Sequence, residues 1–414
     1  MKVIDLFAGA GGLSEGFRNN QFEFICHIEK EVSACLTLKL RNIYYYLKET
    51  HNLKLYNDYL KNKLTFEQLS NKIPKEITEN ILNYEINNRN LPEIFNYIDK
   101  KIGQNPLDGI IGGPPCQAYS TIGRAKNKYK KEVDERIYLY EYYVEFLNKY
   151  NPKFFIFENV KGLLSFKDFE HKPLLPIIID AFSSVGYNVN YKIINTENFG
   201  ISQKRERLFI IGFRKNLNID QNFFTLLENY KCKAPSINEL FSDLPRLKAG
   251  ESKNKYLSPL DFSEISKKYR CSSTDILTQH ISRPNNENDL EIYKLVAKAQ
   301  KEGIKLKYNE LPKSLITHSN TKSFLDRYKA IDGESVSHTV VAHISKDGHY
   351  YIHPDNSQNR SITIREAARI QGFPDNYYFE TSRTAAFKQI GNAVPPKLSK
   401  RLSKVILHIL NDKI

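Results

Sequence analysis

The sequence predicts an α/β fold in which helices cover both faces of a largely parallel sheet. The chain opens with a short apolar run at residues 3–7, a glycine-rich turn, a helical stretch and a second apolar run at 22–28. A strand, turn, helix and strand in this order form half of a doubly wound sheet. Three further short apolar runs, at 109–111, 154–157 and 208–213, have the spacing of strands in βα units.

The glycine turn after the first run has the pattern Gly9-x-Gly11-x-x-Ser14. The dinucleotide-binding fingerprint requires a third glycine where Ser14 stands, so an NAD site is disfavoured. Glycines here still allow the backbone to approach an adenosine-containing cofactor closely. Glu29, at the end of the second run, is placed to accept hydrogen bonds from ribose hydroxyls. A tight turn with a purely structural role explains the pattern almost as well, so both interpretations stay open.

Residues 31–106 predict a mostly helical insertion. No glycine occurs between Gly16 and Gly103, and Leu, Lys, Glu and Asn are frequent.

The segment Gly-Gly-Pro-Pro-Cys-Gln at 112–117 follows the third apolar run directly. Two glycines and two prolines predict a rigid, non-helical turn. This turn would present Cys116 at the carboxyl edge of the sheet, where open α/β folds bind their ligands. A small buried thiol is the alternative interpretation of a lone cysteine, but it gives no reason for the prolines.

A basic run follows this cysteine, with five positive residues and no acidic residue between 124 and 131. Such a run is commonly a solvated surface. Its position favours contacts with phosphates instead, made by Arg124, Lys126, Lys128, Lys130 and Lys131.

Polar residues that could take part in catalysis flank the next two apolar runs. Glu158 comes directly after the run at 154–157, and burial at a strand end would raise its pKa toward neutrality. A solvent-exposed acid is the alternative. Arg205 and Arg207 share one face of an extended segment before the run at 208–213. One of these guanidinium groups could donate to a carbonyl or phosphate oxygen.

Periodicity weakens between residues 216 and 355, which predicts a region of mixed structure. Regular patterning returns at 363–370 and 397–410. We therefore expect a large domain built from residues 1–215 and 386–414, and a small domain at 216–385.

The composition is that of a globular chain, with 414 residues, 41% hydrophobic and 26% charged. Lys and Arg number 61 against 47 Asp and Glu, a formal net charge of +14 that favours a polyanionic partner. No apolar run is long enough to cross a membrane, and no secretory signal begins the chain. A reducing cytosol suits its five cysteines, which form no CxxC pair. These features predict a cytoplasmic protein.

Together the motifs resemble those of the cytosine-C5 DNA methyltransferases of bacterial restriction-modification systems. The resemblance covers nearly the whole chain except 31–106 and 216–355, and it rests on the following segments: the Phe-x-Gly-x-Gly turn within 5–17, Pro114-Pro115-Cys116-Gln117, Asp134-x-Arg136-x-x-Leu139, Glu158-Asn159-Val160, Gln203-x-Arg205-x-Arg207, 360–374 and 389–396.

The resemblance implies a Rossmann-like large domain that uses S-adenosylmethionine and a smaller target-recognition domain around 216–355. It also implies a mechanism. The thiolate of Cys116 adds to C6 of a cytosine flipped out of the duplex, and C5 becomes nucleophilic toward the methyl group of the cofactor. Glu158 engages N3 and the exocyclic amine, and Arg207 donates to O2 with Arg205 in support. Loss of the C5 proton then expels Cys116.

The resemblance further implies a set of cofactor-binding residues, namely Phe7, Ala8, Gly9, Gly11, Gly12, Leu13, Glu29, Pro114, Asn392 and Ala393. The family's acidic residue at the adenine edge has only a poor counterpart here, Asn90-Leu91. Four histidines lie between 338 and 353, but their spacing fits no common zinc site, so we expect no metal.

Two other functions are compatible with parts of this pattern. A tRNA cytosine-C5 methyltransferase shares the fold, but about 140 residues between 214 and 353 leave room for a dedicated DNA reader. A binding protein without catalysis is disfavoured because Cys116, Glu158 and Arg207 are all present. We expect a monomer that acts on double-stranded DNA at the bacterial nucleoid, with a restriction endonuclease as a possible functional counterpart.

Overall fold

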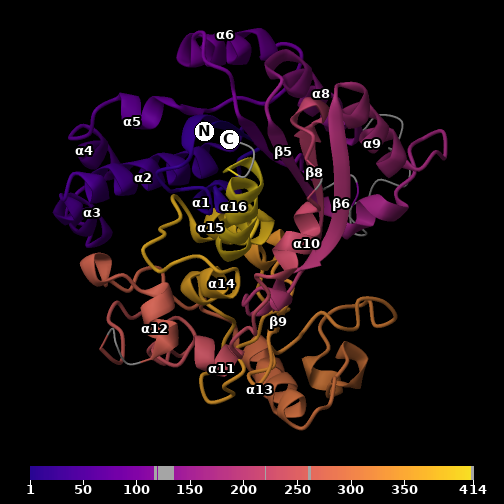
Figure 1. Cartoon of the computed structure of the whole chain (residues 1–414). Coiled ribbons are helices and arrows are strands. Elements are labelled where there is room, and N and C mark those ends of the chain that lie inside the picture. Colours follow the sequence, from indigo (N-terminus) through magenta and orange to yellow (C-terminus); the bar gives the residue numbers. More distant parts are fainter. Residues whose placement is uncertain (116–118, 120–134, 220, 260–262, 412–414) are drawn as a thin grey trace.

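A computed structural model describes residues 1–115, 119, 135–219, 221–259 and 263–411 (Figure 1). The main sheet has seven strands in the order β3-β2-β1-β4-β5-β8-β6. Their bounds are β1 Lys2–Leu6, β2 Glu23–Ile28, β3 Ile81–Leu82, β4 Gly109–Gly112, β5 Phe154–Val160, β6 Tyr187–Asn195 and β8 Glu206–Arg214.

The sheet is parallel from β3 to β5, and β8 then pairs antiparallel with both β5 and β6. The predicted α/β fold with a largely parallel sheet is therefore confirmed. All five apolar runs form strands of this sheet. The edge strands β3 and β6 were not predicted, because β3 has only two residues and β6 has only two buried residues among its nine.

Helices cover both faces of the sheet because the strand side chains alternate between two cores. Ile110, Phe155 and Phe157 pack against α6 (Leu91–Ile102), α8 (Leu139–Tyr150) and α9 (Leu174–Ser184). Ile111 and Phe154 face the opposite core, which includes α1 (Gly12–Glu15), α10 (Phe223–Glu228) and α16 (Pro396–Asn411). In Figure 1 the yellow α16 crosses this second face, although it comes from the far end of the chain.

Residues 31–106 are mostly helical and also include the short strand β3. The helices are α2 (Val32–Glu49), α3 (Leu53–Leu60), α4 (Phe66–Ser70), α5 (Glu76–Glu79) and α6. A separate apolar cluster joins α2, α3 and α4, and it also contacts Ile276 and Tyr378 from much later in the chain.

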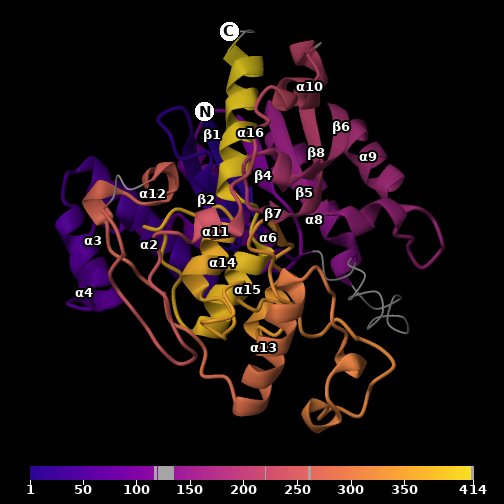
Figure 2. The same cartoon turned by 90° about the horizontal axis from the view of Figure 1, so that it is seen from below.

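The chain between α10 and α16 forms a second body beside the sheet (Figure 2). Its core joins α11 (Ile237–Leu240), α14 (Ile364–Ile370) and α15 (Arg383–Asn392). The other helices are α12 (Glu264–Tyr269) and α13 (Glu287–Lys301), and α13 anchors a smaller apolar cluster of its own. A two-stranded parallel ladder connects β7 (Gln203–Lys204) to β9 (Ser337–His338).

Buried charge pairs organise the core of this second body. Arg369 on α14 lies 2.5 Å from Asp243 and 2.6 Å from Asp375, and all three side chains are almost completely buried. A capping box at Thr363 and Glu366 begins α14, and Glu366 also pairs with the buried Arg360 at 2.7 Å. Arg369 therefore holds two separate segments against one helix.

We predict that Arg369→Met strongly destabilises the protein, by about 3–5 kcal/mol, because two buried carboxylates would lose their shared partner. Urea unfolding measures this loss. Lys267→Met is the control, because Lys267 pairs with Glu264 on an exposed helix surface. Equal unfolding free energies for Arg369→Met and the native chain would contradict the assigned role.

Candidate active site

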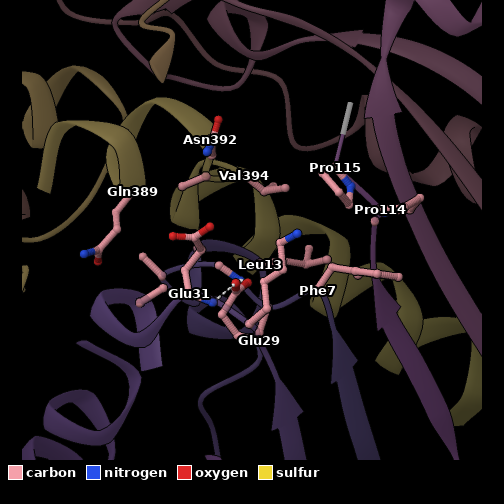
Figure 3. Close-up of a pocket in the computed structure, with 18 of the residues that line it drawn as sticks. Phe7, Leu13, Glu29, Glu31, Pro114, Pro115, Gln389, Asn392 and Val394 are labelled. Carbon is pink, nitrogen blue, oxygen red and sulfur yellow. Dashed lines mark hydrogen bonds between the residues drawn. The ribbon is translucent and has the colours of Figure 1, made fainter. Parts of the chain in front are cut away.

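A cavity of about 230 Å³ opens at the carboxyl edge of the sheet, where β1, β2, β4 and β5 end (Figure 3). Nine of the ten residues predicted to bind the cofactor line it: Phe7, Ala8, Gly9, Gly12, Leu13, Glu29, Pro114, Asn392 and Ala393. Gly11 is not among the lining residues, and a Cβ at this position would lie 2.7 Å from the side chain of Leu38 and 3.2 Å from the hydroxyl of Tyr377. Glu158, Arg205 and Arg207 line the same cavity.

Glu29 ties the glycine loop to the end of β2. One carboxylate oxygen accepts a hydrogen bond from the backbone N–H of Gly9 at 2.7 Å, and the other accepts one from Glu31 at 2.8 Å. Burial raises the pKa of Glu29, while these backbone hydrogen bonds oppose the shift. A carboxylate with free lone pairs therefore lies beside the loop, as recognition of ribose hydroxyls would require.

The glycine loop packs against the segment that follows α15. A Cβ on Gly12 would lie only 2.2 Å from the carbonyl oxygen of Val394, so a side chain cannot fit at this position. Figure 3 shows Val394 and Asn392 facing Leu13 and Glu29 across the cavity. The loop and the C-terminal segment thus form opposite walls of one site.

Residues after the short strand β3 also line the cavity, and sequence reasoning missed them. They are Tyr84, Glu85 and Ile86. Glu85 lies 2.9 Å from Lys30 at the entrance. An acidic residue three positions after an apolar pair was the available signal, but two apolar residues are too few to predict a strand.

The turn after β4 lies flush against β5. A Cβ on Gly113 would lie 2.0 Å from the carbonyl oxygen of Glu158, and Asn159 donates from Nδ2 to the carbonyl of Pro114 at 3.4 Å. Pro114 and Pro115 both line the cavity. The two residues directly before Cys116 therefore lie in the cavity wall. Cys116 itself lies outside the described residues.

Glu158 and Arg207 form the polar pair of the site. Arg207 Nε lies 3.1 Å from Glu158 Oε1, and both side chains are largely buried. Their strands pair antiparallel, with Val160 opposite Arg207. Burial raises the pKa of Glu158, whereas Arg207 and Arg205 oppose the shift. The pair combines a carboxyl group that can hold a proton with a cationic hydrogen-bond donor.

Arg205 has different partners from Arg207. Its guanidinium donates to the carbonyls of Val340 at 2.8 Å and of Gly391 and Ala393 at 3.1 Å each. Gln371 also donates to the Ala393 carbonyl. Arg205 is buried. Its hydrogen bonds to Gly391 and Ala393 fix the part of the cavity wall that is formed by the end of α15 and the residue directly after it.

The sequence matches the family model for C-5 cytosine-specific DNA methylase over residues 1–408. The chain belongs to this family. It is 39% identical to the Type II methyltransferase M.Bpa9945I of Bacillus paralicheniformis, with 99% of both chains covered. It is 30% identical to the Type II methyltransferase M.DdeI of Desulfomicrobium norvegicum, with 100% of this chain and 91% of that protein covered.

Solved structures agree with the fold. An E. coli protein assigned as a DNA modification methyltransferase encoded within a prophage superposes with a TM-score of 0.63 at 21% identity, and 99% of each chain is covered. The Dnmt2 methyltransferase of S. pombe gives 0.53 at 14% identity, covering 99% of both chains. The resemblance inferred from the motifs is confirmed, and this chain is a DNA cytosine-C5 methyltransferase. The tRNA alternative has less support.

Other residues singled out in the sequence are dispersed or outside the described part of the chain. The basic run at 124–131 lies outside it. His338 stacks on Tyr351, His349 bonds the hydroxyl of Tyr293, and His353 stacks on Phe241. Among the described residues, no cluster of three or more His, Cys, Asp or Glu could hold a metal. No helix of the described part is both long and apolar enough to cross a lipid bilayer.

Hydrogen bonds and an ion pair from the second body and α2 support the glycine loop of the methyltransferase. The sequence did not predict these contacts. The hydroxyl of Tyr377 donates to the carbonyl of Ala10 in the loop. Arg41 on α2 lies 2.5 Å from Glu15, directly after the loop, and donates to the side chain of Asn376 at 3.1 Å. The second body and α2 thus hold the loop from the side opposite the cavity.

We predict that Tyr377→Phe lowers the affinity for S-adenosylhomocysteine about fivefold, because the Ala10 carbonyl loses a buried hydrogen bond. Isothermal titration calorimetry measures the affinity. Tyr187→Phe is a matched control, since Tyr187 is also buried and donates to a carbonyl, that of Pro152, at 2.9 Å. An equal loss of affinity in both variants would assign Tyr377 only a general role in stability.

Proposed function

We propose that this methyltransferase modifies a cytosine flipped out of a specific duplex sequence, with S-adenosylmethionine bound in the cavity. The observation that carries the proposal is the convergence of two groups on one cavity. The Glu29-supported glycine loop and the Glu158–Arg207 pair both line it, and the turn that leads to Cys116 lies between them.

The lining residues suit a nucleoside cofactor. Glu29 would accept hydrogen bonds from the ribose, and the glycine loop would leave room for the cofactor against the backbone. Glu85, after β3, is our candidate for the adenine edge, in place of Asn90-Leu91. S-adenosylmethionine supplies an activated methyl group on a sulfonium centre. Phe7, Leu13 and Pro114 would form the apolar wall beside it.

The opposite wall suits a cytosine ring. Arg207 would donate to O2, and Glu158 would contact N3 and the exocyclic amine, so that charge does not build up on the ring while a nucleophile adds to C6. We assign that nucleophile to Cys116, since two prolines and the close packing of Gly113 fix the turn before it. Arg205 would act indirectly, by holding the carbonyls of Gly391 and Ala393.

The basic run and the second body would bind the DNA. We propose that the run at 124–131 contacts phosphates, and that residues 216–355 read the sequence, within the proposed small domain 216–385. The large domain would comprise 1–215 and 386–414. We infer that the protein acts as a monomer in the cytoplasm. Its biological role would be to methylate the DNA of the nucleoid and so protect it from a cognate restriction endonuclease.

Transfer of a labelled methyl group to duplex DNA, with tRNA as the competing substrate, tests the proposal. We expect transfer to DNA, and a covalent adduct with a duplex that contains 5-fluorocytosine, because fluorine cannot leave C5 as a cation. Cys116→Ser should abolish transfer and the adduct, since a neutral hydroxyl is a far weaker nucleophile than a thiolate. Substantial turnover by Cys116→Ser would exclude Cys116 as the nucleophile, and exclusive transfer to tRNA would overturn the proposed substrate.

Exchange of the recognition region tests where the sequence is read. Residues 231–355 would be replaced by the equivalent segment of a relative with a different target, which leaves α10 packed in the core beside α16. Phosphate contacts position a protein, whereas base-edge contacts specify its site. We therefore expect bisulfite sequencing to show methylation at the donor's target. An active chimera that still modifies the original target would locate the reader elsewhere, with residues 31–106 as the next candidate.

A further inference from the structure

A small basic lobe, residues 301–329, extends from α13. It contains seven Lys or Arg and three Asp or Glu. Lys305, Lys307, Lys313 and Lys322 are exposed. In Figures 1 and 2 this orange segment projects from the rest of the second body. Its charge suits contact with a polyanion such as duplex DNA.

Phe324 is the most exposed large apolar residue of the described chain, with 76% of its surface accessible. Its backbone adopts a left-handed conformation with φ of 54°. That conformation is unfavourable for a bulky side chain and common for glycine. A strained residue with so little of its surface buried gains little stability from packing, so the strain calls for another explanation.

Arg327 holds this conformation in place. Its guanidinium donates three hydrogen bonds to loop carbonyls: to Phe324 at 3.0 Å, to Asn320 at 2.7 Å and to Ser323 at 3.1 Å. The same guanidinium lies 4.1 Å above the ring of Tyr308, which is buried in the apolar cluster of the lobe. The loop is therefore braced from its own core, and the phenyl ring is presented to solvent on a supported turn.

The lobe is connected to the catalytic edge of the sheet through direct contacts. Tyr350 donates to Asp326 at 3.1 Å, and its ring lies 4.9 Å from that of His338 on β9. β9 pairs with β7, which ends at Lys204, directly before Arg205 and three residues before Arg207. The braced loop is thus attached to the strand that leads into the active site.

We propose that the ring of Phe324 inserts between stacked bases of the bound duplex, as an apolar wedge beside the target cytosine. This proposal rests on the proposed function at duplex DNA. Apolar side chains inserted at a base step partly unstack it and bend the duplex, and an aromatic ring recovers stacking with the bases that it separates. The basic residues of the lobe supply the phosphate contacts around it, and local unstacking makes the target base easier to flip.

Phe324→Gly is the informative variant, because glycine favours the left-handed backbone and removes only the ring. Phe324→Tyr keeps an aromatic ring, and Ile304→Ala removes another exposed apolar side chain of the lobe, 53% accessible in the native chain. The target would first be mapped by bisulfite sequencing. Duplexes carrying 2-aminopurine at each purine position of the target would then report unstacking by fluorescence, with S-adenosylhomocysteine present.

For Phe324→Gly we expect loss of the fluorescence increase at one base step and about tenfold weaker binding of the target duplex. Binding of a random duplex should stay within about twofold, because the phosphate contacts remain. Phe324→Tyr and Ile304→Ala should resemble the native enzyme. If the native enzyme methylates DNA, and Phe324→Gly keeps both the fluorescence increase and the native affinity for the target duplex, the wedge role of Phe324 is overturned while the proposed function stands. If the native enzyme transfers no methyl group to DNA, the proposed function fails instead.

Discussion

At the carboxyl edge of the sheet, backbone packs directly against backbone, and the organisation of the site depends on this contact. A Cβ at Gly113 would lie 2.0 Å from the carbonyl oxygen of Glu158, and one at Gly12 would lie 2.2 Å from that of Val394. Because no side chain separates them, the turn after β4 meets the end of β5, and the glycine loop meets the segment after α15. The cofactor loop, the proline turn and the Glu158–Arg207 pair are therefore gathered around a single cavity.

Several carbonyls in the loops around this cavity accept hydrogen bonds from side chains, and buried carbonyls without partners are costly. Side chains from distant segments satisfy them. Tyr377 donates to Ala10, Gln371 to Ala393, and Arg205 to Gly391 and Ala393. Two of these donors belong to the second body, and two of the three acceptors, Gly391 and Ala393, lie at the end of α15 and directly after it. The cavity is thus completed by both bodies, and its shape depends on how they pack together.

The charges of the chain are divided between two tasks. Glu29 and Glu158 are largely buried at the cavity, where burial raises their pKa and hydrogen bonds or arginines oppose the shift. The excess of positive charge that gives the chain its net +14 includes the exposed lysines of the 301–329 lobe. Exposed cations suit a duplex backbone, and desolvated carboxyls suit hydrogen bonds to a nucleoside or a base. The same division of charge fits a DNA-modifying enzyme.

The sequence by itself determined the fold class, the five strands with apolar runs, and nine cavity-lining residues of the ten named for the cofactor, because these depend on short contiguous patterns. Tertiary structure alone decided the rest. β3 is two residues long, so Glu85 could not be placed from periodicity. Tyr377 and Ala10 are 367 residues apart, and the carbonyl partners of Arg205 lie 135 to 188 residues away. No local pattern encodes such contacts, because they form only when the second body packs against the sheet.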